Sequence, residues 1–282
     1  MFGILLYVAA MALSVAMSAA GKWLAADYSI AQIVFFRVLF AFIPLVVILG
    51  WERKVHLSTK HPALQIFRGL CMLAAMSLFF LALRYLPLAD TEAAFATTPL
   101  FMTLFAMFFL GERLRGSTTA AVVLGLLGSS LMLRPTQELL RAEVLIPLIA
   151  AVFAAFAMIV TRRLARADAS STTFCWGNAV VLLGASSSLP VVWLTPTAMD
   201  MLVIVFMGVA GGLSTYCEIE ACRHAPINRL APFDYTSLIW AVVLGYALWG
   251  DFPDAWTWLG AAAIVVGGLH VIATSEARKA KS

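Results

Sequence analysis

Charged residues are scarce in this chain. Asp, Glu, Lys and Arg make up 12% of its 282 residues, whereas 62% are hydrophobic, and a soluble globular domain has about 25% charged residues. So little charge excludes a protein whose whole surface faces water. The hydrophobic residues also fall into long blocks instead of the amphipathic stripes of a soluble core. The sequence therefore predicts an all-α integral membrane protein with the lipid bilayer as its surroundings.

Motifs for metal, redox or catalytic chemistry are also missing from the sequence. The four cysteines lie inside hydrophobic blocks without a CxxC pair, and the four histidines lie at block edges or in loops without an HExxH pair. No GxSxG nucleophile stands in a suitable setting. We therefore expect no metal, no cofactor and no enzyme activity. No polar segment is long enough to form a domain that binds nucleic acid.

Ten hydrophobic blocks are long enough to cross a bilayer. A hydrocarbon core of about 30 Å requires about 20 apolar residues in an α-helix. The first block could instead be a signal peptide, although no basic residue precedes it. The predicted spans are residues 3–21, 30–50, 66–84, 89–110, 118–134, 144–162, 172–194, 200–222, 229–249 and 256–274.

The basic residues indicate how the spans are oriented. If the N-terminus is cytoplasmic, 14 of the 19 Lys and Arg residues fall on the cytoplasmic side and 4 on the outer side, while Arg37 lies within a span. Cytoplasmic loops carry an excess of Lys and Arg. This bias predicts a multi-pass protein of a bacterial-type cytoplasmic (inner) membrane with both termini in the cytoplasm.

The sequence contains an internal repeat. Shifted by 139 positions, the third to fifth spans match the eighth to tenth over about 65 residues, with Gly69 on Gly208, Arg84 on Arg223 and Thr97 on Thr236. We therefore divide the chain into two five-helix units, residues 1–137 and 138–282. Because five is odd, the second unit is inverted relative to the first. Such 5+5 inverted-topology repeats are typical of secondary transporters with a site at the midplane.

Two segments resemble the signature of the EamA branch of the drug/metabolite transporter superfamily. The segment 84–112 has a proline after the third span, Pro99 inside the fourth, and a closing Gly-Glu. The segment 223–251 is similar, but Pro232 stands earlier in its helix and an aspartate replaces the glutamate. The resemblance covers essentially the whole chain. It implies ten helices with cytoplasmic termini around a cavity lined by spans 3, 4, 8 and 9, with help from spans 1 and 6.

The resemblance also implies transport of a small molecule. Members of the family include amino-acid exporters and uptake carriers for riboflavin or S-adenosylmethionine. We favour a secondary transporter that exports an amino acid or a related metabolite by alternating access, with uptake of a planar vitamin such as riboflavin as the alternative. A passive channel and a membrane enzyme are less favoured. Either direction, a coupling proton, and a monomer or a homodimer are compatible with the sequence.

Ionisable side chains inside spans cost about 2.5–3.5 kcal/mol on insertion scales, which makes each a candidate for substrate binding or coupling. Arg37 lies near the middle of the second span, where an ion pair and a substrate or gating role are both open. Glu92 lies in the first turn of the fourth span, where helix capping is the alternative. Glu218 shares a helix face with Ser214 and Thr215. Burial favours a neutral carboxyl group, so Glu218 could carry a coupling proton, although pairing with Arg37 would oppose this.

A polar cluster near the start of the ninth span supplies further candidates. This cluster is more polar than a lipid-facing segment requires, and it could line the cavity; it consists of Asp234, Tyr235, Thr236 and Ser237. Tyr216, Tyr235 and Trp240 could stack on a planar substrate, although Tyr and Trp near span ends usually form an interfacial belt.

Two prolines inside spans are candidate hinges. Proline removes a backbone hydrogen bond from a helix, which permits bending at Pro99 and Pro232. A static kink is the alternative at both positions.

Overall fold

The computed structural model describes residues 2–52, 58–86, 88–111 and 145–249, together with 123–124, 127, 143, 259, 262–263 and 266. In these ranges the elements are α-helices, and none is a strand. The predicted spans 118–134 and 256–274 lie almost entirely outside the described residues, so the count of ten spans stays a prediction. The closing Glu112 and Asp251 of the two similar segments also lie outside them.

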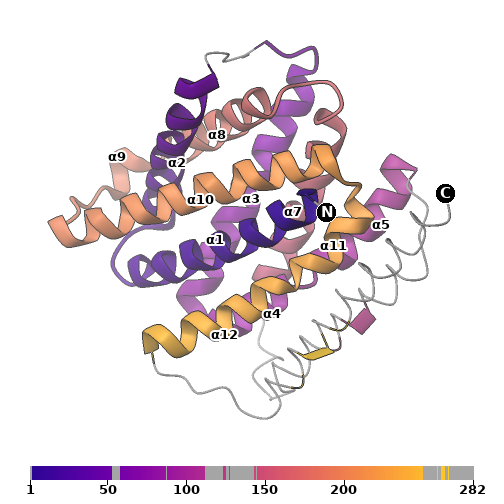
Figure 1. Cartoon of the computed structure of the whole chain (residues 1–282). Helices are drawn as coiled ribbons and strands as arrows, with labels where there is room; N and C mark the ends of the chain where they lie inside the picture. The colour runs from indigo at the N-terminus through magenta and orange to yellow at the C-terminus, as the bar shows by residue number, and fades with distance from the viewer. Residues whose placement is uncertain are drawn as a thin grey trace.

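The helices form one bundle in which the two halves of the chain are interleaved (Figure 1). The first half contributes α1 (Phe2–Ala25), α2 (Ile30–Glu52), α3 (Pro62–Tyr85), α4 (Leu88–Phe95) and α5 (Thr98–Leu110). The second half contributes α7 (Leu145–Leu164), α8 (Ser170–Ser186), α9 (Leu189–Val192), α10 (Ala198–His224), α11 (Ile227–Asp234) and α12 (Thr236–Trp249).

Five segments of the described chain are long and apolar enough to cross a membrane. Four of them are the helices α1, α3, α7 and α10, and the fifth is Arg229–Leu248, which contains most of α11 and α12. The shorter segments Ile30–Pro44 and Thr98–Leu110 are also apolar. Together with the low charge content, these segments identify an all-helical integral membrane protein.

Local sequence signals account for several helix ends. Pro62 begins α3, where its fixed φ suits the first turn and its missing N–H costs no hydrogen bond. The Thr197 hydroxyl caps α10 by accepting a hydrogen bond from the Asp200 backbone N–H at 3.2 Å. Gly111 ends α5 at φ 64°, a left-handed conformation that glycine adopts without the steric cost of a Cβ atom.

The fourth and ninth predicted spans are each divided into two helices. The break between α4 and α5 falls at Ala96 and Thr97, and the break between α11 and α12 falls at Tyr235. Pro99 lies in the first turn of α5, whereas Pro232 lies inside α11, where it removes a backbone donor from the last turn. The sequence therefore located both spans but did not separate their two parts.

The repeat of 139 positions extends to the helix boundaries. The helix α4 covers 88–95 and α11 covers 227–234, so both of their ends are related by this shift. Contacts between helices recur in the same way: α1 packs on α10 as α7 packs on α3, and α2 packs on α10 as α8 packs on α3. Figure 1 shows α1 and α10 side by side. Each half therefore supplies equivalent surfaces to the other.

Glycines allow the closest of these contacts. A Cβ atom on Gly212 of α10 would lie 2.6 Å from the carbonyl oxygen of Ala41 in α2. A Cβ atom on Gly69 of α3 would lie 2.5 Å from Cβ of Val180 in α8. Small residues let helix backbones approach closely inside membranes, where apolar burial alone does not drive association.

Candidate functional site

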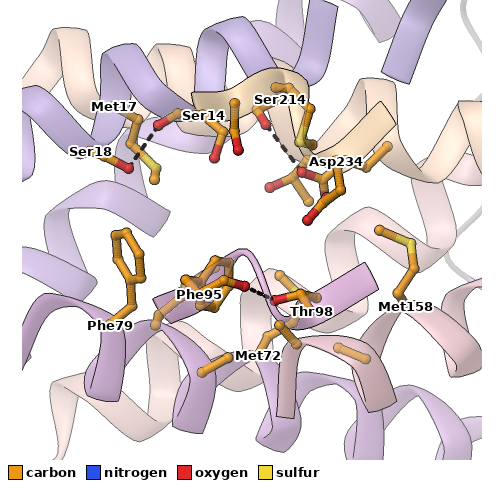
Figure 2. Close-up of a pocket in the computed structure, with 18 of the residues that line it drawn as sticks. Ser14, Met17, Ser18, Met72, Phe79, Phe95, Thr98, Met158, Ser214 and Asp234 are labelled. Carbon is orange, nitrogen blue, oxygen red and sulfur yellow. Dashed lines mark hydrogen bonds between the residues drawn. The ribbon is translucent and has the colours of Figure 1, made fainter. Parts of the chain in front are cut away.

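A cavity lies in the middle of the bundle, between the two halves of the chain (Figure 2). Both halves of the chain contribute to its lining. The first half contributes residues from α1, α2, α3, α4 and α5, and the second half contributes residues from α7, α10, α11 and α12. The sequence resemblance implied a cavity between spans 1, 3, 4, 6, 8 and 9, and the lining confirms that arrangement. Arg37 of α2 is an additional contributor.

The two halves line the cavity with equivalent positions but different chemistry. Six lining residues of the first half have a counterpart 139 positions later that also lines the cavity. These pairs are Ser18 with Ala157, Ala75 with Ser214, Met76 with Thr215, Phe79 with Glu218, Phe95 with Asp234, and Thr98 with Ser237. At these positions the wall from the first half is mainly apolar and aromatic, with Ser18 and Thr98 as its polar members, whereas the wall from the second half is polar and acidic except at Ala157.

Both helix breaks lie at the cavity. Phe95 and Thr98 flank the break between α4 and α5. Asp234 ends α11 at the second break, and Ser237 is the second residue of α12. All four residues line the cavity. In Figure 2, Phe95 and Thr98 lie across the open space from Asp234. Discontinuous helices at the interface of two repeats are a recurring feature of transporter binding sites.

Arg37 is buried at 5% exposure and faces the cavity from α2. Its Nε donates to Sδ of Met17 at 3.1 Å, its Nη1 to Sδ of Met76 at 3.2 Å, and its Nη2 to the Thr215 hydroxyl at 3.3 Å. These acceptors are neutral, and thioether sulfur is a weak acceptor.

Arg68 is a second buried arginine in the cavity lining, at 3% exposure. Arg68 is one of the 14 basic residues that the predicted charge bias counts on the cytoplasmic side. Its Nε donates to the Thr161 hydroxyl at 2.6 Å and its Nη1 to the Thr173 carbonyl at 3.2 Å. Gly177 provides the space for this guanidinium, because a Cβ atom there would overlap Nη1. Its position inside the predicted span 66–84 was the signal that could have found it.

Three carboxyl groups face the same cavity. Glu92 of α4 is buried at 5% exposure, Glu218 of α10 accepts a hydrogen bond from the Ser214 hydroxyl at 3.3 Å, and Asp234 of α11 accepts one from the Tyr7 hydroxyl at 2.9 Å. Within the described residues, Oε1 of Glu92 is buried without a hydrogen-bond partner.

Charges of both signs thus share the cavity without direct contact between them. In the described part of the chain, no hydrogen bond or ion pair of 4 Å or less joins Arg37 or Arg68 to a carboxylate. A buried charge without a partner is costly in a low-dielectric interior. The arrangement therefore suits a ligand that supplies the missing partners.

The other candidates from the sequence lie outside the lining. Tyr216 packs on Phe174, with ring centroids 6.4 Å apart, and Tyr235 is fully buried beside the second break. The Thr236 hydroxyl donates to the Phe233 carbonyl at 2.6 Å, and Trp240 packs against the hydrophobic cluster around α5 and α11. The structure brings together Arg37, Glu92, Glu218 and Asp234 but not these four. Ser237, which the sequence placed in the polar cluster with Asp234, lines the cavity, whereas Tyr7, Ser14, Ser18 and Arg68 also line it and were missed.

Polar networks tie the helices together beyond the cavity. The Asp168 carboxylate accepts hydrogen bonds from the Thr59 hydroxyl at 2.5 Å and from Gln65 Nε2 at 2.8 Å. In the loop between α1 and α2, the Tyr28 hydroxyl donates to the Asp200 carboxylate at 2.8 Å. Burial and this hydrogen bond raise the pKa of Tyr28, so it stays protonated as the donor.

Comparisons with known proteins agree with this architecture. The sequence profile described as the EamA-like transporter family matches residues 1–134 and again residues 141–273. A protein of known crystal structure superposes with a TM-score of 0.79 over 99% of both chains, at 21% identity, which shows a shared fold.

Two of the relatives have different names, and both names are those of transporters. The S-adenosylmethionine uptake transporter of Rickettsia felis is 27% identical over 89% of this chain and 85% of its own length. The pseudopaline exporter CntI of Pseudomonas aeruginosa is 27% identical over 98% of this chain and 97% of its own length. One relative is named for uptake and the other for export.

Proposed function

The chain belongs to the EamA-like transporter family, and from that premise we propose that it moves a small zwitterionic metabolite across the membrane by alternating access. Family membership and the transporter names of the relatives indicate a multi-pass membrane transporter of small metabolites, not an enzyme. The finer proposal concerns the class of substrate and the way in which the cavity handles it.

The unpaired charges of the cavity carry this proposal. A zwitterion such as an amino acid has a carboxylate and an ammonium group, and the cavity offers guanidinium groups at Arg37 and Arg68 and carboxyl groups at Glu92, Glu218 and Asp234. Burying a charge is costly unless the charge is paired and hydrogen-bonded. A zwitterion bound here would relieve the cost of unpaired charge on both sides of the contact.

The membrane arrangement is part of the proposal. Ten helices in two inverted five-helix units, residues 1–137 and 138–282, would place both termini in the cytoplasm and the cavity near the midplane. The two matches to the family profile, the helix boundaries related by 139 positions and the exchangeable helix contacts support it. In this arrangement the breaks at α4/α5 and α11/α12 act as hinges, and the cavity opens to each side in turn.

We favour export of an amino acid or a related metabolite. S-adenosylmethionine, named for one relative, contains an amino-acid group, and the exporter relative supports the outward direction. Alternating access is reversible, so the coupling gradient sets the direction. Riboflavin uptake, the alternative from the sequence, has no support from the relatives and serves best as a control ligand.

Glu218 and Asp234 are the proposed carriers of a coupling proton. A carboxyl group that faces both the cavity and charged neighbours can exchange a proton when the cavity opens to water. Glu218→Gln and Asp234→Asn should then flatten the pH dependence of transport across mildly acidic and neutral pH. Wild-type rates and wild-type pH dependence in both variants would rule out this role.

Ligand-induced stabilisation of the detergent-purified protein tests the substrate class. A ligand that binds only the folded state raises the apparent melting temperature by mass action. We expect a saturable shift with amino acids or amino-acid derivatives, and no shift with their decarboxylated amines or with riboflavin. A shift with the amines equal to that with the parent amino acids would contradict a role for the arginines in binding a carboxylate.

A further inference from the structure

The acidic residues of the cavity differ in their charged neighbours. Glu218 lies within electrostatic range of both Arg37 and Arg68. The charged neighbour of Glu92 is Asp234, and that of Asp234 is Glu218. The arginines therefore act on Glu218, whereas Glu92 and Asp234 interact electrostatically with other acidic groups and also with the side chains of Ser18 and Tyr7, respectively. The cavity has one end where charges of both signs balance and one end that is negative.

Glu92 has a buried carboxyl oxygen without a partner among the described residues at this negative end, while its carboxyl group also interacts with the Ser18 side chain. Glu92 lines the cavity at 5% exposure, and the oxygen without a hydrogen-bond partner is Oε1. Capping of α4 was the alternative role for Glu92. A capping carboxylate accepts hydrogen bonds from the first backbone N–H groups of its helix, so the unpartnered buried oxygen argues for a ligand instead.

Aromatic rings lie next to this end of the cavity. Phe95 follows Glu92 by three residues on α4, which puts the two on the same side of the helix. Phe79 packs edge-to-face on Phe95 with ring centroids 4.9 Å apart, and both rings line the cavity. Figure 2 shows Phe79 and Phe95 across the open space from Ser18 and Asp234. The electron-rich face of an aromatic ring attracts an organic cation.

Charge balance points to the same class of ligand. The lining contains two arginines and three carboxyl groups, so in the state without a bound coupling proton, with all five groups ionised, the cavity has an excess of one negative charge. A neutral zwitterion adds one charge of each sign and leaves this excess in place. A ligand with a second cationic group removes it.

We propose that the negative end formed by Glu92, Asp234, Phe79 and Phe95 is a subsite for an organic cation, so that the cavity selects amino-acid derivatives with an additional positive group. This inference rests on the proposed function. The ligand carboxylate binds at Arg37, and its ammonium, guanidinium or sulfonium group lies between the two carboxyl groups and the phenylalanine rings.

Matched ligand pairs test the cation directly. L-Arginine and L-citrulline have the same shape but differ in charge, and S-methylmethionine and methionine differ in a sulfonium group. Dissociation constants of the purified wild-type protein for these four ligands should favour at least one cationic member over its neutral partner by about tenfold or more, a difference of roughly 1.4 kcal/mol. Equal or weaker binding of both cationic members would overturn the inference.

Variants place the preference at the subsite. Glu92→Gln and Phe95→Leu should reduce the preference for the cationic member severalfold while leaving the affinity for the neutral member within about twofold of wild type, since the neutral member does not use the subsite. Glu220→Gln is the matched control, because Glu220 lies on α10 outside the lining and accepts a hydrogen bond from Ser170. Elution as a monodisperse species in detergent checks folding. An unchanged preference in both subsite variants would overturn the inference.

The outcomes separate this inference from the proposed function. If neutral amino acids bind in an Arg37-dependent way and the cationic members do not bind better, the cation subsite is wrong and the zwitterion cavity stands. If no member of either pair binds, both the cation subsite and the proposed binding of a zwitterion are wrong.

Discussion

At the scale of single residues, Arg37 combines deep burial with weak, neutral partners. Its three hydrogen bonds go to two thioethers and one hydroxyl. A structural arginine inside a membrane protein would be expected to pair with a carboxylate, since removing one member of a buried pair costs several kcal/mol. Glu218 stabilises the guanidinium without contacting it, so the direct contacts of Arg37 leave room for a ligand carboxylate, which agrees with a role in binding a ligand.

This environment predicts the effect of replacing Arg37 with methionine. Arg37→Met keeps an unbranched side chain beside Met17 and Met76 and removes a costly buried charge, so the melting temperature should stay the same or rise. The affinity for amino-acid ligands should fall by about 10- to 100-fold, because a hydrogen bond to a charged group contributes about 1.5–3 kcal/mol. Melting curves with and without ligand measure both effects.

A matched control separates the effect of losing the positive charge at Arg37 from the effect of lowering the net charge of the protein. Arg163 on α7 is exposed, and Arg163→Gln should leave ligand affinity unchanged. A large fall in the melting temperature of Arg37→Met with no loss of affinity would instead identify Arg37 as a structural residue.

At the scale of the elements, the close contacts at glycine predict unequal effects of added methyl groups. Gly212→Ala would bring Cβ to 2.6 Å from the Ala41 carbonyl oxygen, a backbone atom that cannot move without displacing α2. The variant should lose about 1–3 kcal/mol of stability, or fail to fold, as overpacked cores do. Melting temperature and folded yield in detergent report this loss.

Gly184→Ala is the comparison for that variant. The atom that its Cβ would meet belongs to the end of the Leu73 side chain, which can rotate away. We expect a change of well under half the effect of Gly212→Ala. Equal effects in the two variants would show that the backbone contact between α10 and α2 has no special cost.

The broken helices predict a separation of binding from transport. Pro99→Ala and Pro232→Ala restore backbone donors near the two breaks and favour longer continuous helices. If the breaks act as hinges, transport should slow severalfold while ligand affinity stays within about twofold, because hinge residues act on the conformational step. Flux and equilibrium binding on the same preparations measure the two quantities.

Pro62→Ala provides the control for the hinge variants. Pro62 begins α3 at a position where its ring causes no break, so the substitution should alter neither flux nor affinity. Wild-type flux in both hinge variants would favour static kinks at Pro99 and Pro232.

At the scale of the whole molecule, hydropathy and the repeat identified most of the fold in advance. Every predicted span within the described residues overlaps a helix or a pair of helices, and the shift of 139 positions reappears in helix ends and contacts. Long apolar blocks determine a membrane helix because lipid leaves few alternatives to it. The breaks at Thr97 and Tyr235 were not predicted, since proline does not say where a helix resumes.

The site was only partly predictable for a related reason. Intramembrane charge singled out Arg37, Glu92, Glu218 and Asp234, and all four line the cavity. Tyr7, Ser14 and Ser18 carry no charge, and their orientation depends on the packing of α1 between α10 and α3. Tyr216 and Trp240 were chosen by residue type alone, and helix rotation turns both away from the cavity. Whether such a side chain faces the cavity depends on contacts between segments that are distant in the sequence. A single sequence does not specify these contacts.

Counterflow in proteoliposomes tests most directly whether this cavity transports by alternating access. Vesicles preloaded with an unlabelled ligand from the binding screen are diluted into a trace of the same ligand carrying a radioactive label. A carrier with one alternately exposed site exchanges the two, so we predict a transient, saturable accumulation of label above the outside concentration, abolished in Arg37→Met. A label that only equilibrates, with a rate that does not saturate, would contradict alternating access and indicate a passive pore.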